Sequence, residues 1–192
     1  LLTGFLPYFA FRETYNGCVG AARGGGSLLS HPSVTPSDLL FVSWILEGLT
    51  RFTVFLLFLG AAWLAGIDFT LFDPGNIMLA FAMLSCLGFG LGALIEAFSS
   101  IIYTLPKIMG MFMRILYFTS GVMIPITTLP PAVQDILFYN PLVHLIATVR
   151  GAFMPIQPID DVSLPYAFTF MVGMLVFGLV SMRALQRRVT SA

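Results

Sequence analysis

The chain has 192 residues, of which 58% are hydrophobic and only 9% are charged, and its mean hydropathy is +0.94. A soluble domain carries roughly 25% charged residues, so this composition excludes a chain that covers a water-exposed surface and predicts an integral membrane protein. The formal net charge is zero, which gives no indication of a nucleic-acid partner.

The first element is an apolar stretch that opens with LLTGFLPYFAF. We expect a membrane-spanning helix over residues 1–22 that continues through Arg12 and Glu13. The opening has no initiator Met, basic n-region or small-residue cleavage site, so it lacks the features of a signal peptide. We expect the sequence to be the middle of a longer protein, cut before or inside a hydrophobic segment.

A polar segment and a second span follow. Residues 23–38, RGGGSLLSHPSVTPSD, are rich in glycine and proline and are predicted to form a loop. Asp38 is predicted to be the N-cap of a helix over residues 39–65. In that helix Glu47 and Arg51 have the favourable i,i+4 order. For these charges, as for those of the first span, structural pairing is favoured over lining a substrate path.

The sequence predicts three more spans, at residues 77–95, 107–124 and 162–182, where the chain is apolar over about the length that a bilayer requires. Prolines interrupt residues 125–161, and residues 183–192 close the chain as a polar tail. The expected fold class is therefore an all-α polytopic membrane protein in which five transmembrane helices are present.

Basic residues in short loops predict the orientation of these spans. The side that receives Arg23, Lys107, Arg183, Arg187 and Arg188 is expected to be cytoplasmic. The opposite side carries Asp68, Asp73, Asp135, Asp160 and Asp161, with Arg150 as its only basic residue. The first span then starts outside the cell, and the C-terminal tail lies in the cytoplasm.

Small residues gather in the span over residues 77–95. The segment SCLGFGLG places Gly88 and Gly92 four residues apart, and such residues let helix backbones approach closely in lipid. Packing within one chain is favoured here over a seam between two copies.

The sequence contains no pattern of catalytic or metal-binding residues. The glycines at 24–26 lack the following lysine of a phosphate-binding loop, and the two histidines, His31 and His144, form no metal-binding motif. No carboxylates are paired at helical spacing within a span. We therefore expect a non-enzymatic membrane protein without a metal or cofactor of its own.

Residues 117–155 read YFTSGVMIPITTLPPAVQDILFYNPLVHLIATVRGAFMP, and the chain begins with GFLPYFAF followed by Asn16, Gly20, SLL and VTPSD. These segments resemble the membrane subunit of ABC type-2 exporters, specifically the group that exports capsular polysaccharide or O-antigen. The resemblance covers essentially the whole chain and implies six spans in the full-length protein, with the first span and an amphipathic helix preceding this sequence.

The resemblance implies that residues 125–161 form two short re-entrant helices that act as a periplasmic gate. Its candidate residues are Pro125, Leu129, Pro130, Asn140, Pro141, His144 and Arg150. Asn140 also has a local interpretation as an N-cap before a proline. Arg150 either reaches the lipid headgroups or pairs with a carboxylate such as Asp160 or Asp161, or it contacts substrate.

Two further sets of residues come from the resemblance. The loop at 23–38 is expected to dock on an ATPase subunit rather than act as a plain linker, through Arg23, Leu28, Leu29, His31, Pro32, Val34, Pro36 and Asp38. A translocation path for sugars would use Tyr103, Tyr117, Phe118 and Tyr139, although such aromatic residues also commonly face lipid.

The resemblance predicts a permease subunit in a bacterial inner membrane that works as a homodimer with two ATP-binding subunits, which hold the ATP and Mg²⁺. Its cargo would be a lipid-linked polysaccharide, of capsular or O-antigen type, and periplasmic or outer-membrane export proteins are further candidate partners. The alternatives are a drug or lipid exporter of the same fold, and a membrane scaffold subunit that transports nothing. An intramembrane enzyme is the third and least favoured alternative.

Overall fold

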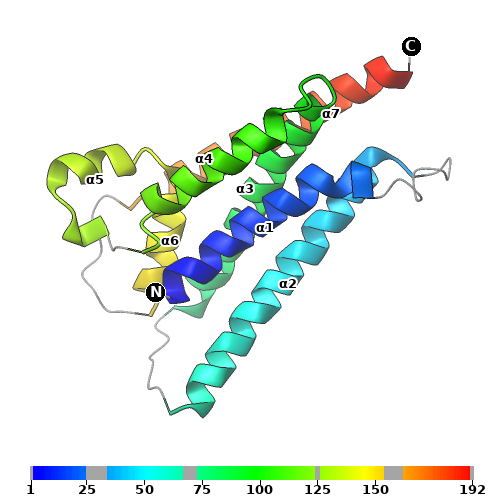
Figure 1. The fold of residues 1–192 in the computed structure, drawn as a ribbon. Helices are drawn as coiled ribbons and strands as arrows, with labels where there is room; N and C mark the ends of the chain where they lie inside the picture. Colours follow the sequence, from blue (N-terminus) through cyan, green and yellow to red (C-terminus); the bar gives the residue numbers. More distant parts are fainter. Residues whose placement is uncertain (1, 25–33, 67–72, 124–125, 154–161, 191–192) are drawn as a thin grey trace.

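The computed structural model of the chain describes residues 2–24, 34–66, 73–123, 126–153 and 162–190, with side chains for all of these except residues 2, 22, 23, 127 and 185–190. Every regular element in these ranges is helical. The elements are α1 (Leu2–Gly24), α2 (Pro36–Leu64), α3 (Pro74–Ser99), α4 (Leu105–Thr119), the 3₁₀ helix η1 (Ile126–Thr128), α5 (Pro131–Leu137), α6 (Pro141–Gly151) and α7 (Leu164–Thr190) (Figure 1). The expected all-α fold class is confirmed.

Proline at the first helical positions sets the start of α2, and the prediction that Asp38 is its N-cap is wrong. The N-cap is Thr35, and Asp38 occupies the third helical position of a capping box. The Thr35 N–H donates to Asp38 Oδ2 at 2.8 Å, and the Asp38 N–H donates to Thr35 Oγ1 at 3.4 Å. The helix begins at Pro36 because proline at this position has the required φ and no N–H to satisfy.

Other helix ends also differ from the sequence prediction. α7 continues to Thr190, so the segment expected to be a tail after residue 182 is largely helical. α3 begins at Pro74 rather than residue 77, because Asp73 caps it by accepting the N–H of Asn76 at 3.2 Å. α4 begins at Leu105, before the expected residue 107, and ends at Thr119, so the prediction that it continues through residues 120–123 is wrong, and residue 124 lies outside the described residues. An uncharged run marks what can enter a membrane, whereas caps and prolines decide where the helix begins.

The centre of the fold is α3, which packs against α1 on one face and α7 on another. A Cβ added at Gly88 would lie 2.5 Å from the carbonyl oxygen of Phe11, and one at Gly92 would lie 2.6 Å from Cys18 Cβ. Both glycines therefore sit directly against α1, because only a residue without a side chain allows this approach. The expectation that they pack within one chain is confirmed.

A second glycine contact joins α3 to α7. Gly90 and Gly178 face each other, and a Cβ added at Gly178 would overlap the carbonyl oxygen of Gly90. A Cβ added at Gly90 would lie 2.9 Å from the backbone nitrogen of Leu175. The glycines of α3 thus allow close packing against two different helices: Gly88 and Gly92 face α1, and Gly90 faces α7.

α2 is the most exposed of the long helices. It meets α1 near its N-terminal end and leans away from the other helices toward its C-terminal end (Figure 1). Most of its large apolar side chains are exposed, including Leu46, Leu57 and Leu64. A surface of this kind suits a hydrocarbon environment, where apolar side chains need no cover.

The short helices α5 and α6 lie at one end of the molecule, between the end of α4 and the start of α7 (Figure 1). They meet at a bend of 108°. Side-chain hydrogen bonds tie α6 to both neighbours, because Asn140 contacts Ser120 after α4 and His144 contacts Ser163 before α7. The chain therefore enters and leaves this helix pair at the same end.

Three of the described helices are long and apolar enough to cross a bilayer: α2, α3 and the portion Leu164–Ala184 of α7. Counting the bent α5–α6 pair as one span would raise the number to four. α4 has only 15 residues, and α1 carries polar residues along its length. The chain is thus a helical membrane protein with three to four candidate spans by these criteria.

Candidate functional site

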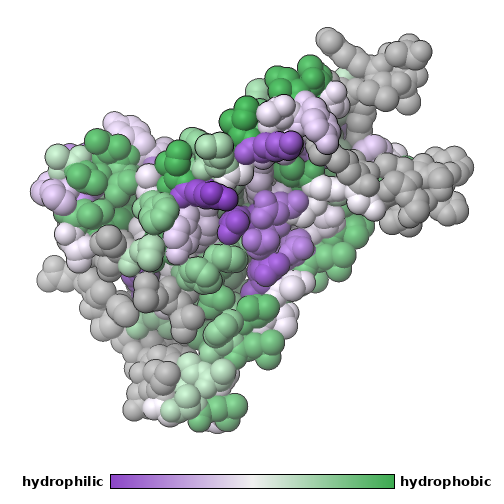
Figure 2. Space-filling view, in the orientation of Figure 1, coloured by the Kyte–Doolittle hydropathy of each residue, from purple (hydrophilic) through white to green (hydrophobic). Residues whose placement is uncertain are grey.

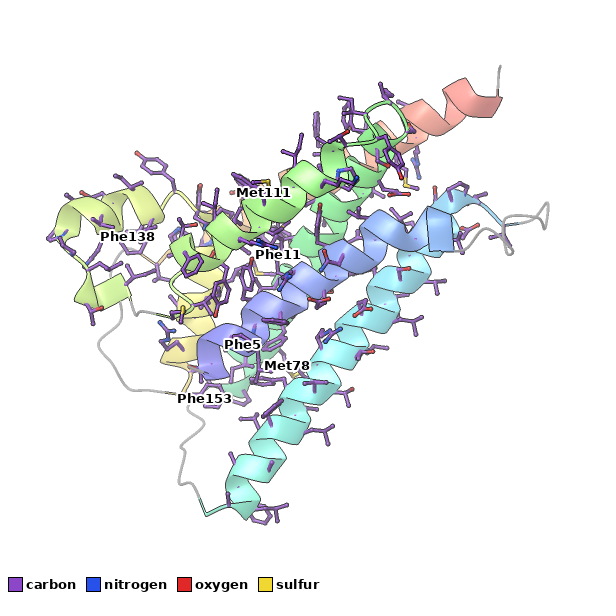
Figure 3. All side chains as sticks on the ribbon, in the orientation of Figure 1. Phe5, Phe11, Met78, Met111, Phe138 and Phe153 are labelled. Atoms are coloured by element: carbon purple, nitrogen blue, oxygen red, sulfur yellow. The ribbon has the colours of Figure 1, made fainter. Side chains whose placement is uncertain are left out.

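A cleft of about 310 Å³ lies between α1 and α4. Its lining consists of Phe5, Tyr8, Phe9 and Arg12 from α1 and Met113, Arg114, Tyr117 and Phe118 from α4. Figure 3 labels Phe5 on α1 and Met111 on α4, the two helices that form its walls. On α1 the four residues are spaced i, i+3, i+4 and i+7, which places them on one face of the helix.

Aromatic rings form the floor of this cleft and hold one another in place. The rings of Tyr8 and Tyr117 meet edge to face with centroids 5.1 Å apart, and Phe5 meets Tyr117 in the same way at 6.4 Å. The hydroxyl of Tyr8 donates to the carbonyl oxygen of Met113 at 2.5 Å, which joins the two walls directly. Tyr8 is buried, whereas Phe118 at the rim is 71% exposed, so the cleft has a fixed floor and an open edge.

Two arginines accompany the aromatic residues. The guanidinium carbon of Arg12 lies 5.6 Å from the centroid of the Phe9 ring, and Arg12 Nε lies 4.0 Å from Glu13 Oε1. Arg114 is exposed, and none of the ion pairs among the described residues includes it. Figure 2 shows hydrophilic side chains gathered over the middle of α4, α1 and α2, on a surface that is otherwise largely apolar.

The structure brings together two of the four aromatic residues expected on a translocation path. Tyr117 and Phe118 line the cleft. Tyr103 lies before α4 with Lys107 Nζ 6.0 Å from its ring centroid, and Tyr139 is 79% exposed between α5 and α6, so neither lines the cleft.

Sequence reasoning missed the α1 side of the cleft and Arg114. The sequence did contain a signal for the α1 side. Phe5, Phe9 and Arg12 have helical spacing, which places two aromatic residues and one basic residue on the same face of α1. Their pairing with α4 depends on contacts between residues about 100 positions apart, which helical spacing does not reveal.

Asn140 has the N-cap role that the sequence predicts. Its Oδ1 accepts the N–H of Leu142 at 3.1 Å, which satisfies a free donor at the start of α6. Its Nδ2 donates to Ser120 Oγ at 3.1 Å, just after α4. One side chain therefore starts α6 and also fixes it to the end of α4.

His144 is almost fully buried, with 3% of its surface exposed, and both of its ring nitrogens are used. Nδ1 accepts the N–H of Ser163 at 3.2 Å, so the ring proton must be on Nε2, which donates to the carbonyl oxygen of Phe138 at 2.8 Å. The ring also stacks on Phe138 and meets Tyr166 edge to face. His144 thus joins α5, α6 and α7 in its neutral form.

Arg150 contacts backbone. Its Nη2 donates to the carbonyl oxygen of Val122 at 3.1 Å. A Cβ added at Gly4 would lie 2.8 Å from this nitrogen, so the start of α1 also packs closely against the guanidinium. The alternative partners Asp160 and Asp161 lie outside the described residues.

The remaining gate and loop residues are described in part. Leu129 supplies a carbonyl oxygen that accepts Gln134 Nε2–H at 2.7 Å, Pro130 precedes α5, and Pro141 is buried at the start of α6. Pro125, Leu28, Leu29, His31, Pro32 and the side chain of Arg23 lie outside the description. Of the expected docking loop, Val34, Pro36 and Asp38 are described, and all three lie at the start of α2.

The charge pair expected within α2 is present. Arg51 Nη2 lies 3.2 Å from Glu47 Oε2, with both side chains about one-third exposed. A Cβ added at Gly17 would lie 2.9 Å from Glu47 Cγ, so the pair packs against α1. Glu47 and Arg51 thus form the ion pair that the sequence predicts.

These features define a helical membrane protein with a sharply bent pair of short helices and an aromatic cleft that contains two arginines. Residues 27–154 match the ABC-2 type transporter family, so the chain belongs to that family. It is 30% identical to the polysialic acid transport protein KpsM of Escherichia coli over 183 residues, which are 95% of this chain and 71% of KpsM. It is 25% identical to the capsule polysaccharide export inner-membrane protein BexB of Haemophilus influenzae over 185 residues, which are 95% of this chain and 69% of BexB.

The family assignment confirms the resemblance drawn from the sequence. Membership gives the chain the role of a transmembrane transport subunit and implies an ATP-binding partner. The apolar helices and the inner-membrane location stated in the name of BexB agree with the expected location in a bacterial inner membrane.

Proposed function

We propose that this chain is the permease subunit of an ATP-driven exporter that moves a polysaccharide across the inner membrane. The observation that carries the proposal is the cleft between α1 and α4, where aromatic rings from the two helices form the floor. Aromatic faces pack against apolar surfaces without requiring one fixed hydrogen-bond pattern, which suits a chain of sugars that must slide. The likeness to KpsM and BexB, whose names state polysaccharide transport, supports the same cargo class.

The proposal includes five crossings by α1, α2, α3, α4 and α7. Such a topology places the α1–α2 connection in the cytoplasm, where it would dock on the ATP-binding subunit, and the α5–α6 pair at the periplasmic face. Support comes from the positions of the basic residues and from the common end at which α4 finishes and α7 starts. Within α1, Arg12 would be tolerated because it lines the cleft, and Thr14 because it is buried against Gly88 of α3.

In this proposal two copies of the chain act with two ATP-binding subunits, which hold ATP and Mg²⁺. ATP-driven movement at the cytoplasmic end would shift α1 relative to α4 and change the width of the cleft. Asn140, His144 and Arg150 would transmit that shift to the gate, because each joins α6 to a neighbouring segment. Periplasmic export proteins would receive the polymer beyond the gate.

The test is polysaccharide export by cells that lack their own permease and express the complete gene together with the ATP-binding subunit. Tyr117→Ala removes a ring that contacts both Phe5 and Tyr8. We expect polysaccharide at the cell surface to fall about three- to tenfold, since aromatic contacts of this kind are worth roughly 0.5–1.5 kcal/mol each. Phe112→Ala is the matched control, because Phe112 is an exposed ring on α4 that does not line the cleft.

Three results would contradict the proposal. If the two variants reduce export equally, the cleft has no special part in transport. If the exporter moves drugs or lipids but no polysaccharide, the family fold is correct and the cargo class is wrong. If nothing is transported although the protein is present and folded, the scaffold alternative is favoured.

A further inference from the structure

Arg114 is a charged residue within an apolar stretch of α4, which is an unusual position for a purely structural residue. It occupies the middle of α4, where the preceding segment is MGMFM and the following segment is ILYF. Among the described residues no carboxylate forms an ion pair with it. A guanidinium in an apolar helix of a membrane protein is costly unless an anion, a carbonyl or water satisfies its donors, and such a residue commonly marks a substrate site.

Arg12 faces the same cleft with most of its donors unused. Its closest approach to a carboxylate is the 4.0 Å between Nε and Glu13 Oε1, at the outer limit of an ion pair. Glu13 also accepts a hydrogen bond from Asn16 Nδ2 at 3.5 Å. A guanidinium has five N–H donors, so at Arg12 this single long contact leaves donors available to a ligand.

The lining of the cleft is therefore positively charged, and in the part of the chain that the structure describes only Arg12 of its two arginines has a carboxylate nearby, at the 4.0 Å limit of an ion pair. Its lining contains Arg12 and Arg114 and, among the described residues, no aspartate or glutamate. The pair Glu47–Arg51 on α2 shows the opposite arrangement, in which the arginine is already bound at 3.2 Å. The cleft arginines are thus available to bind a ligand, whereas Arg51 is neutralised within its own helix.

We propose that Arg12 and Arg114 bind an anionic oxygen group of the cargo, a carboxylate or a phosphate, while the aromatic floor contacts the adjoining sugar ring. This inference rests on the proposed function and adds that the exported glycan is acidic or carries an acidic anchor. The planar guanidinium fork matches the two oxygens of a carboxylate or phosphate, and the hydrogen bonds that it donates to such a group are charge-assisted. A neutral sugar would leave both arginines without a counter-charge.

Two parts of a glycan could supply the anion, and the experiment separates them. The complete exporter with its ATP-binding subunit is reconstituted in nanodiscs, and binding is measured by isothermal titration. The probes are oligosialic acid, the same oligosaccharide with its carboxylates reduced to alcohols, and a short-chain phosphatidic acid. Tight binding of oligosialic acid assigns the site to carboxylates along the polymer, and tight binding of the phosphatidic acid alone assigns it to a phosphate at a lipid anchor.

We expect the preferred anionic probe to bind at least tenfold more tightly than the neutral one, because charge-assisted hydrogen bonds carry this preference. Arg114→Gln should remove most of the preference, and Arg114→Lys should keep part of it because the charge remains. Lys107→Gln is the control, since it removes a charge from the same helix outside the cleft. The size-exclusion profile of each complex shows whether it is folded and assembled.

The inference is overturned if acidic and neutral probes bind equally, or if the preference survives Arg114→Gln. Equal binding of the acidic and neutral glycans would leave the proposed export function standing and remove only the anionic site. Absence of binding by every probe to the assembled wild-type complex overturns the inference and argues against the polysaccharide cargo as well.

Discussion

At the scale of single residues, His144 shows how one buried side chain can hold the bent pair of helices α5 and α6 against α7. Its ring is hydrogen-bonded to backbone groups on either side, at Phe138 and Ser163, and these bonds fix both the tautomer and the ring orientation. The resemblance drawn from the sequence identified His144 as a candidate residue. Its partners Phe138 and Ser163 could not be predicted from the sequence, because they lie outside the helix that contains His144.

We expect His144→Ala to weaken the junction of α5, α6 and α7. The substitution leaves the partly buried N–H of Ser163 and carbonyl oxygen of Phe138 without these partners, at a cost of up to about 1 kcal/mol each, and it removes the buried ring packed between Phe138 and Tyr166. Thermal unfolding of the detergent-solubilised protein should therefore occur at a clearly lower temperature.

Tyr166→Phe is the matched control for this prediction. It removes one hydrogen bond, from the Tyr166 hydroxyl to the carbonyl oxygen of Tyr139, at an exposed site where water replaces the lost partner. The expected change is much smaller than that of His144→Ala. Similar losses in the two variants would show that His144 is not the main connection between these helices.

At the scale of elements, the fold depends on how closely α3 approaches its neighbours. Gly88, Gly90 and Gly92 alternate between α1 and α7, and each lies where a side chain would meet backbone or Cβ atoms. The sequence segment SCLGFGLG predicted close packing correctly because the size of glycine is itself the cause. Which helices it would contact was not evident from the spacing alone.

We expect Gly88→Ala to destabilise the protein by separating α1 from α3. The new Cβ would lie 2.5 Å from the carbonyl oxygen of Phe11, and backbone atoms cannot move aside without shifting the helix. A loss of roughly 1–3 kcal/mol is typical of such overpacking. Denaturation in mixed detergent micelles measures this change.

Gly173→Ala is the control for the same substitution in a transmembrane helix. Gly173 lies in α7, with no atom within 4 Å of an added Cβ, so the change should be neutral or stabilising by up to about 1 kcal/mol through helix propensity. If Gly88→Ala proves as harmless as Gly173→Ala, the close contact between α1 and α3 is not required for the fold.

The sequence predicted helices more reliably than their ends or their arrangement. Apolar runs identified α2, α3 and α7, because a bilayer demands length and hydrophobicity together. The start of α2 was misplaced because Thr35 and Pro36 determine it, not the first charged residue before the apolar run. The cleft was predicted only in part, because Tyr117 and Phe118 have partners on α1 that are distant in sequence.

At the scale of the whole molecule, the chain has the layout expected of the membrane half of a transporter. A glycine-packed centre around α3 lies beside an open aromatic cleft on α1 and α4, while α6 is hydrogen-bonded to the segments that follow α4 and precede α7. In the function proposed above, the cleft binds and guides the polymer, and membership of the ABC-2 type transporter family implies that a partner supplies the energy. The central claim is therefore that this chain converts the ATP-driven motion of another subunit into movement of a glycan.

The most direct measurement of that claim is co-purification of the protein from the complete gene with its ATP-binding subunit, followed by ATPase assays with and without residues 24–34. We predict a stable complex whose ATPase activity is raised by an acidic oligosaccharide, and we predict that the deletion abolishes this stimulation while both subunits remain folded. Failure of any ATP-binding subunit to co-purify, or stimulation that is unchanged by the deletion, would contradict the proposed coupling between the two subunits.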